Sequence, residues 1–502
     1  MTALQDLVRT VHDETAHAAD GILRSDAQAT NSAAQRALYV SRVPVHPKKV
    51  SGTFRRLKWA ALTVMLGLYY LLPWMRWDRG PNSPDQAVLA DVANGRLYFF
   101  WIEIWPQEVY YITGLLIMAA VFLFLVTALF GRVWCGYACP QTVWTDLFIL
   151  VERWIEGDRN ARIKLDKSNW TIAKLAKRAT KHAVWLVIAA ATGGAWILYF
   201  HDAPSLAAEF FTGQAPVSAY AFAGILTFTT YSLAGLMREQ VCTYMCPWPR
   251  IQAALIDVET LQVTYRTDRG EARGPHKKGQ SWEGRGHCID CRQCVAACPM
   301  GIDIRDGSQL ECINCALCID ACDEVMVKVG LPKGLIAYDT DLNIARRQAG
   351  ERQRFTLIRA RTVLYAVVLV LVGGGILAAL AARSTIDLNV LRDRNPTYVR
   401  LSDGSIRNAY TVKILNRTND EETYVITVEG LPSAEIKAVG VEQLGPDLAV
   451  TGAPDAVRDV RVLVTVPPAA LTADSMPVTV RVKAASGAEA ANDTVFLSGA
   501  MK

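Results

Sequence analysis

Cysteine is missing from most of this 502-residue chain. All twelve cysteines lie between Cys135 and Cys322, and the long segment after Cys322 contains none. A secreted protein held together by disulfides would spread its cysteines through the domains that they stabilise. The sequence therefore excludes a disulfide framework and directs attention to one cysteine-rich region.

Histidine and net charge are also scarce. A net charge of +5 on 55.2 kDa is too dilute to indicate nucleic-acid binding, so we expect no nucleic-acid partner. Of seven histidines, only His182 and His201 border an apolar tract. They stand at opposite ends of the same tract, about 28 Å apart if it is helical, and cannot ligate one haem together.

Uncharged apolar tracts are plentiful. Each of the five is long enough to cross all or nearly all of a hydrocarbon core of about 30 Å, which excludes a wholly soluble protein. Residues 144–155 instead fit an amphipathic helix lying on the membrane surface. The five tracts are 59–75, 109–130, 183–200, 217–237 and 362–382.

Basic residues predict the orientation of these tracts. The segment before the first tract has no apolar run of signal-peptide length, so we expect that tract to be a retained membrane helix. The connections 76–108, 131–182 and 201–216 hold three, ten and no Lys or Arg. The positive-inside rule then predicts a multi-pass protein with its N-terminus, second and fourth connections in the cytoplasm and its C-terminus outside.

Period-two patterns follow the last apolar tract. They are separated by turn signals such as Gly-Leu-Pro and predict an external β-sandwich of about 110 residues. This region has neither cysteine nor tryptophan, so "immunoglobulin-like" can refer only to its topology, and another small all-β domain is the alternative. The expected strands are 410–415, 423–428, 436–441, 457–466, 477–483 and 494–497.

Eight cysteines form two CxxCxxCxxxC runs, the first beginning at Cys288 and the second at Cys312. In bacterial dicluster ferredoxins, three closely spaced thiolates of each run bind one 4Fe-4S cluster and the fourth binds the other. A pair of zinc sites is the alternative, but zinc usually takes two separated CxxC pairs. The predicted ligands are Cys288, Cys291, Cys294 and Cys322 for cluster one, and Cys312, Cys315, Cys318 and Cys298 for cluster two. Proline follows Cys298, whereas Asp323 follows Cys322.

The other four cysteines form a second internal repeat. Cys135 and Cys139, and then Cys242 and Cys246, lie in two CxYxCP motifs, each after a predicted membrane helix. On a continuous helix each pair would share one face, and the following proline would kink or restart the helix. Four thiols, with thioethers from Met237 and Met245, suit copper as Cu(I). The alternative is four inert cysteines at a helix contact.

This combination resembles the FixG/CcoG family (RdxA type) of cytochrome oxidase accessory proteins. The features that carry the resemblance are the twin CxxxCP motifs, the two ferredoxin runs, the fifth helix and the external β domain, and they cover nearly everything from residue 50 onward. The resemblance implies a bacterial inner-membrane iron–sulfur protein that assists assembly of the cbb-type cytochrome c oxidase. It also implies reduction of cytoplasmic Cu(II) to Cu(I). Because all twelve cysteines are predicted on one membrane face, our hypothesis is that copper is held and reduced near Cys135, Cys139, Cys242 and Cys246, the candidate catalytic cysteines.

The implied partners are oxidase subunits or copper-delivery proteins and the lipid bilayer, while the electron donor is unidentified and a homodimer is one allowed oligomeric state. Two other functions fit the motifs: a NapH-like quinol dehydrogenase subunit, which lacks the long external domain, and a redox-sensing structural platform for assembly. The expected domains are a cytoplasmic segment 1–56, a four-helix membrane domain 57–260, a dicluster ferredoxin-like insert 261–360, a fifth membrane helix 361–383 and a periplasmic immunoglobulin-like sandwich 384–502.

Overall fold

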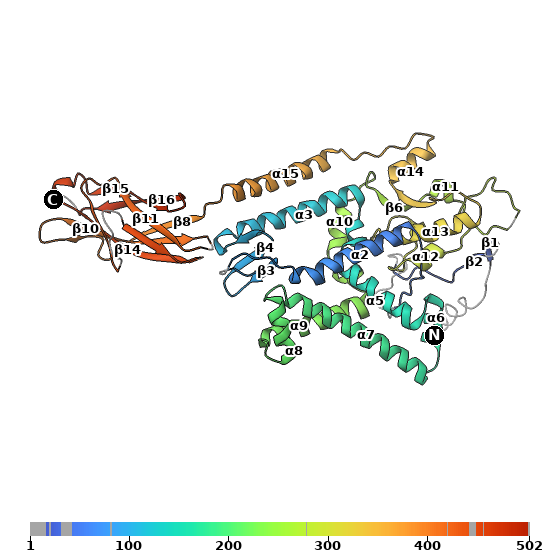
Figure 1. The fold of residues 1–502 in the computed structure, drawn as a ribbon. Coiled ribbons are helices and arrows are strands. Elements are labelled where there is room, and N and C mark those ends of the chain that lie inside the picture. Colours follow the sequence, from blue (N-terminus) through green and yellow to red (C-terminus); the bar gives the residue numbers. More distant parts are fainter. Residues whose placement is uncertain are drawn as a thin grey trace. The chain divides into compact units, whose positions relative to one another are not determined.

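The computed structural model describes residues 17–19, 22–31, 43–80, 83–277, 279–418, 420–440, 448–454 and 456–499. The chain forms two compact units, Met1–Met75 with Gln86–Ile376, and Arg76–Asp85 with Leu377–Lys502. The first carries the helices and the cysteines, and the second carries the sandwich (Figure 1). Much of the predicted N-terminal segment lies outside the described residues.

Every predicted apolar tract is helical. Three of the helices are long and apolar enough to cross a membrane, namely Tyr110–Phe130, Val217–Met237 and Ala360–Ala381, so five crossings are not confirmed by length and composition. The other two tracts belong to helices with charged first halves. The helices are α2 (Thr53–Leu71), α3 (Tyr110–Phe130), α7 (Ile172–Ile197), α9 (Val217–Thr230) continued by the π-helix η3 (Tyr231–Met237), and α15 (Ala360–Ala381).

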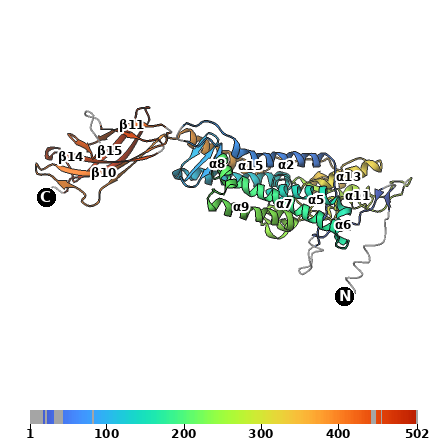
Figure 2. The ribbon, with the colours of Figure 1, turned by 60° about the horizontal axis from the view of Figure 1, so that its bottom comes forward.

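Helices α7 and α9 run side by side in both ribbon views (Figures 1 and 2). A side chain at Gly193 would place its Cβ 2.5 Å from the Ala223 carbonyl oxygen, so only glycine allows this approach. Close packing through small residues is common between membrane helices. Their connection contains α8 (Ala203–Thr212), and η1 (Leu72–Trp74), η2 (Pro106–Glu108) and the sheet β3 (Val88–Asp91), β4 (Arg96–Phe99) and β5 (Ile102–Ile104) lie between α2 and α3.

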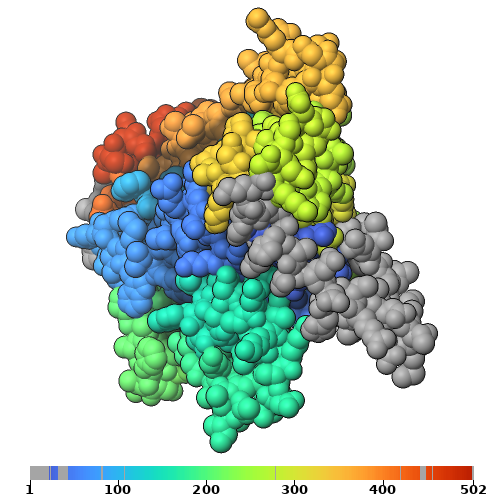
Figure 3. Space-filling model, turned by 90° about the vertical axis from the view of Figure 1, so that its right-hand side faces the viewer, coloured from blue at the N-terminus to red at the C-terminus, as the bar shows by residue number. Residues whose placement is uncertain are grey.

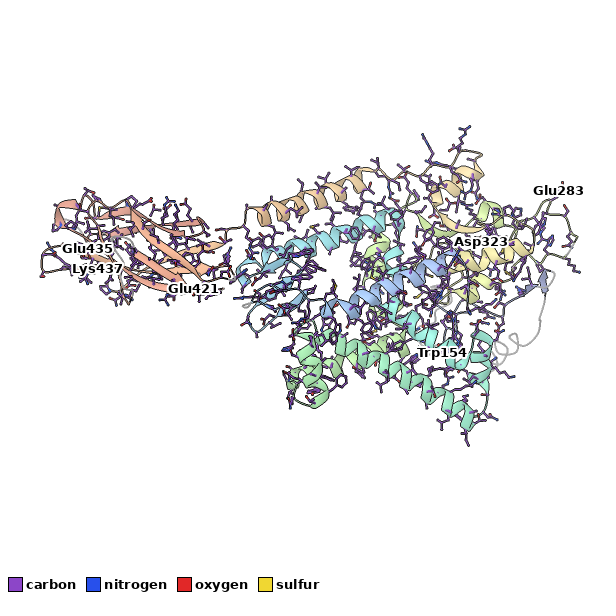
Figure 4. All side chains as sticks on the ribbon, in the orientation of Figure 1. Trp154, Glu283, Asp323, Glu421, Glu435 and Lys437 are labelled. Carbon is purple, nitrogen blue, oxygen red and sulfur yellow. The ribbon has the colours of Figure 1, made fainter. Side chains whose placement is uncertain are left out.

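Residues 144–155 form part of α5 (Pro140–Glu156), which is not the surface-lying helix that the pattern predicts. Phe148 and Val151 are buried against Trp185 of α7, so the apolar face of α5 packs against another helix of the protein. Trp154, labelled in Figure 4, is 85% exposed. The neighbouring elements are α4 (Val133–Tyr137) and α6 (Arg159–Lys167).

The cysteine runs occupy an insert that a two-stranded antiparallel sheet closes. Strand β6 (Gln262–Tyr265) pairs with β7 (Ile336–Asp339), which brings the two ends of the insert together. Figure 3 shows this insert on one face of the first unit. Its other elements are α11 (Thr267–Gly270), α12 (Gln293–Ala297), η5 (Ile304–Asp306), α13 (Leu317–Lys328) and α14 (Asp341–Gln348).

The second unit contains two sheets with a shared apolar core, as the alternation predicts. One sheet has the order β12-β14-β10-β8, with β9 on β10, and the other has the order β13-β11-β15-β16. All six predicted strands are present, although Val441 lies outside the described residues. The strands are β8 (Ile386–Arg392), β9 (Val399–Arg400), β10 (Ile406–Asn416), β11 (Glu422–Glu429), β12 (Glu435–Ala438), β13 (Leu448–Gly452), β14 (Val457–Val466), β15 (Ser475–Ala484) and β16 (Glu489–Leu497), with η6 (Pro468–Ala470) before β15.

Candidate functional site

The two cysteine runs share an unusual backbone. Asp290 and Arg292 have φ of 52° and 54°, and Asn314 and Ala316, at the same places in the second run, have φ of 52° and 60°. Side chains other than glycine adopt positive φ rarely and at a cost, so the repetition reflects a common requirement. Left-handed residues alternating with ordinary ones turn successive N–H groups inward and create concavities for anions, including iron–sulfur clusters. The loops therefore fit the groups that their spacing predicts.

The eight thiols form two groups. Cys322 interacts electrostatically with Cys294, Cys291 and Cys288, although it belongs to the other run. Cys298 interacts in the same way with Cys315 and Cys312, and Cys318 is near both Cys298 and Cys294. The last cysteine of each run thus lies among the first three of the other run, and the two groups adjoin.

Because these cysteine thiols are buried, a bound metal would stabilise them in their charged, thiolate form. Burial raises the pKa of Cys298 to about 12 and that of Cys312 to about 11. The backbone groups of Asn314 beside Cys312, and of Ile302 and Met300 beside Cys298, act in the opposite direction by hydrogen bonding to sulfur. Iron would supply the positive charge that buried thiolates need, and the N–H groups would help to set the potential of a bound cluster.

The second cysteine run departs from the ferredoxin pattern at Asp323, which stands where the first run has proline. Pro299 follows Cys298, and α12 ends at Ala297, since proline cannot continue a helix. Without a proline, α13 continues to Lys328. The Asp323 carboxylate (Figure 4) then accepts a 2.8 Å hydrogen bond from the Gly334 N–H and ties α13 to the segment before β7.

The CxYxCP motifs interrupt their helices at the second cysteine. Cys139 and Cys246 have extended backbone, with ψ of 128° and 124°. Helix α5 restarts at Pro140, and α10 (Trp248–Leu255) begins one residue after Pro247. The first cysteines lie in α4 and in the π-helix η4 (Val241–Met245). Each motif is thus a break between two helices.

These breaks bring four cysteines together. Cys242 interacts electrostatically with Cys139, Cys135 and Cys246. Burial, reinforced by the neighbouring thiols, raises the pKa of Cys135 and of Cys242 to about 12. The Cys135 thiol donates to Gln252 Oε1 at 3.2 Å, and the Gln252 amide donates to Thr127 Oγ1 at 3.1 Å. Within the described part of the chain, no group of three or more His, Cys, Asp or Glu side chains is arranged to hold a single metal ion.

The first motif contacts the loop of the second cysteine run directly. A Cβ on Gly136 would lie 2.6 Å from the Ile313 carbonyl oxygen and 3.0 Å from the Cys315 Cα. The Tyr137 hydroxyl donates to the Cys315 carbonyl at 3.1 Å. Cys135 and Cys242 both pack against the apolar cluster that contains Cys315. The CxYxCP thiols therefore adjoin the second group of cluster cysteines.

Arg132 stabilises this contact through hydrogen bonds to three backbone carbonyls. Its guanidinium donates to the carbonyls of Leu310, of Cys312 at 3.5 Å and of Pro249 at 2.6 Å. Burial lowers the pKa of Arg132, whereas Cys135 and Cys312 raise it, and an arginine remains charged in such a site. The cation thus lies between the motif and the insert.

Sequence reasoning missed Arg132, Gly136 and Gln252 because their partners lie far away in the chain. One signal was available: the first motif has Gly136 where the second has Thr243. A glycine inside a repeated motif indicates close approach of backbone. His182, which cannot share a haem with His201, is hydrogen bonded through Nδ1 to the Tyr231 hydroxyl at 2.9 Å.

Comparisons with known proteins agree with this arrangement. The model of a 4Fe-4S dicluster domain matches residues 237–341, and that of a 4Fe-4S binding domain matches 112–158. The model of the immunoglobulin-like fold at the C-terminus of FixG matches 376–499. Iron–sulfur clusters are therefore cofactors of this chain, and the three apolar helices indicate membrane association.

Three curated relatives are similar over most of their length. The Rhizobium meliloti nitrogen fixation protein FixG is 52% identical over 88% of this chain and 90% of its own. Protein RdxB of Cereibacter sphaeroides is 57% identical over 78% of this chain and 83% of its own. Protein RdxA of the same organism is 50% identical over 86% of this chain and 91% of its own. With the cysteine geometry and the C-terminal fold, these similarities show that the chain belongs to the FixG family of iron–sulfur proteins.

Proposed function

We propose that this protein carries electrons through its cysteine-rich insert to the four CxYxCP thiols and there reduces Cu(II) to Cu(I), assisting assembly of a cbb-type cytochrome c oxidase. The observation that carries the proposal is the contact of Gly136 and Tyr137 with the Cys315 loop. It supports a continuous route from the cluster cysteines to the thiols.

The route begins at two clusters with crossed ligands: Cys288, Cys291, Cys294 and Cys322 for one, and Cys312, Cys315, Cys318 and Cys298 for the other. Bound clusters supply one-electron redox chemistry. The proximity of Cys294 and Cys318 supports transfer between the two sites, because it makes them adjacent. Packing of Cys135 and Cys242 beside Cys298 and Cys315 supports the next transfer.

The ligands at the CxYxCP motifs indicate which metal ion accepts the electron. Thiolates and thioethers favour Cu(I) over Cu(II), so binding at these thiols makes reduction of the ion easier. Reduction of Cu(II) to Cu(I) takes one electron, which a bound cluster in its reduced state would supply by losing one electron. Oxidase subunits or copper-delivery proteins would be the recipients of the product.

We further propose five membrane crossings, with the N-terminus and clusters in the cytoplasm and the sandwich in the periplasm. Three crossings, by α3, α9 and α15 alone, would leave Cys135 and Cys242 on opposite sides of the membrane. Their close packing instead supports a crossing by α7 between them. Helix α2 supports a fifth, since its start contacts Asp320 of the insert and Tyr69 near its end donates to the Thr192 carbonyl far along α7.

The test is a reduction assay on anaerobically purified protein that is reduced with dithionite and separated from the excess, with Cu(II) as acceptor and a Cu(I)-specific chelator as reporter. Replacing Cys135, Cys139, Cys242 and Cys246 by serine should abolish protein-dependent copper reduction while leaving about eight irons per chain. Undiminished copper reduction by this variant would contradict the assignment. Cluster reduction by a quinol analogue, insensitive to added copper, would favour a quinol dehydrogenase instead.

A second candidate is a third iron–sulfur cluster on the same four thiols. It is favoured by the match of the 4Fe-4S binding domain to residues 112–158, which include the first CxYxCP motif. Iron analysis separates the candidates, because a third cluster would raise the content to about twelve irons per chain. The quadruple serine variant would then lose about four.

A further inference from the structure

The two CxYxCP motifs have the same cysteine spacing but different surroundings. The first, residues 135–140, faces protein: Gly136 touches the Ile313 and Cys315 backbone, and the Tyr137 hydroxyl donates to the Cys315 carbonyl. These contacts leave no room for another molecule between the motif and the second cysteine run. The first motif is therefore closed on the side of the insert.

The second motif, residues 242–247, borders a pocket. Tyr244, at the place of Tyr137, is 55% exposed, and so is Met245. The thiol-bearing residues Cys242 and Cys246 are both in the wall of this pocket. Thr243, Tyr244 and Met245 of the motif also line this pocket, together with Leu310 and Glu311 of the insert.

The sequence of each motif agrees with its environment. Gly136 and Ala138 are small and permit close backbone packing, whereas Thr243 and Met245 stand at the same places in the second motif. Cys242 also lies in a π-helix, a rare conformation that occurs frequently at functional sites. A thioether beside two thiols forms a set of soft donors that the first motif lacks.

We propose that the two motifs divide the reaction: the first receives electrons from the insert, and the second admits and binds the thiophilic metal ion from the pocket. This inference rests on the proposed copper reduction. A cluster held by the cysteine runs would supply the electron, and the Cys315 loop with Cys135 would form its path to a copper ion held by Cys242, Cys246 and Met245. No proton or further reactant is needed, because one electron converts bound Cu(II) to Cu(I).

Gly136→Ala tests the electron-receiving motif. The added methyl group would meet the Ile313 carbonyl and displace the motif from the loop, so we expect reoxidation of dithionite-reduced clusters by Cu(II) to slow on the order of 10- to 100-fold. Affinity for Cu(I), measured by competition with a chelator, should stay unchanged. Gly194→Ala is the matched control, because a methyl group there meets nothing within 4 Å.

Met245→Leu and Cys246→Ser test the pocket motif and should give the opposite result. We expect Cu(I) affinity to fall about tenfold or more, since a soft donor is lost. Reoxidation of the clusters by ferricyanide, which needs no copper site, should keep its wild-type rate. Equal losses of Cu(I) affinity in Gly136→Ala and Met245→Leu would overturn the division of roles.

Thiol labelling measures the difference in accessibility between the two CxYxCP motifs without relying on copper chemistry. In copper-free protein that retains its iron–sulfur clusters, a bulky maleimide should modify Cys246 at least about tenfold faster than Cys135, as mass spectrometry of the peptides would show. Equal rates would refute the asymmetry even if copper is reduced. Faster labelling of Cys246 in a protein that reduces no copper would instead contradict the proposed function and leave the open and closed motifs established.

Discussion

Glu152 of α5 is the centre of a buried ion cluster beside the CxYxCP region. Its carboxylate pairs with Arg162 at 2.7 Å, Arg238 at 2.9 Å and Lys181 at 3.3 Å, and these cations come from α6, the end of α9–η3 and α7. Burial alone would raise the pKa of Glu152, but the three cations lower it to about 2. One carboxylate therefore compensates charges from three elements.

Glu152→Gln should destabilise the protein by about 3–5 kcal/mol, because it removes the carboxylate that pairs with the buried Arg162 and Arg238, whereas Lys181 keeps its ion pair with Glu156 at 2.9 Å. Thermal unfolding in detergent would measure the loss. The folded pKa is below the unfolded one, so the stabilisation is complete above about pH 4.5 and is lost as the pH falls towards about 2.

The mutant should consequently lose less stability than wild type over that acid range. Glu324→Gln is the control, since Glu324 pairs with Lys328 on the surface of α13 and is 51% exposed. A surface pair of this kind contributes about 0–1 kcal/mol. Equal destabilisation by the two substitutions would disprove the role of the buried cluster.

At the scale of elements, α2 is joined to the insert through its first turn. The Asp320 carboxylate on α13 accepts hydrogen bonds from the backbone N–H groups of Phe54 at 3.2 Å and Arg55 at 2.7 Å. Gly52 precedes the helix, and any side chain there would collide with Asp320. A residue between two cluster cysteines thus caps an apolar helix, as an acidic N-cap would.

Asp320→Asn should weaken this junction by about 1 kcal/mol, because the amide keeps an acceptor but loses the charge that favours a helix N-terminus. Hydrogen exchange of residues 53–57 should become faster, while the iron content stays the same. Asp306→Asn, at an exposed ion pair with Arg273, serves as control. Unchanged exchange at the start of α2 would show that Asp320 does not hold the junction.

At the scale of the whole molecule, the proposal of five membrane crossings rests on the packing of Cys135 and Cys242 against one apolar cluster, which requires both to lie on the same side of the membrane. An epitope inserted after Gly213, in the connection between α8 and α9, should react with antibody in intact spheroplasts if α7 crosses the membrane. An epitope after Gly330 in the insert should react only after lysis. Protection of the first epitope would contradict five crossings and favour three.

Much of the architecture could be predicted because its signals are local. Apolar tracts and strand alternation depend on neighbouring residues, and each ferredoxin run carries its ligand spacing within one short segment. The prediction failed for α5, where buried carboxylates and an apolar face serve packing against α7. It also omitted β8, whose alternating Ile386, Leu388 and Val390 are interrupted by Asp387 and Asn389, residues with low strand propensity.

The sequence by itself indicated the family, the five apolar tracts, the paired cysteine runs and the cysteine-free sandwich, since each of these is a short-range pattern. Only the tertiary structure decided which thiols lie together, that Gly136 and Arg132 join the first CxYxCP motif to the second cysteine run, and that the second motif opens to a pocket. These properties depend on contacts between residues that are far apart in the chain. The periodicity of the sequence cannot predict such contacts, because tertiary packing, and not sequence spacing, brings these residues together.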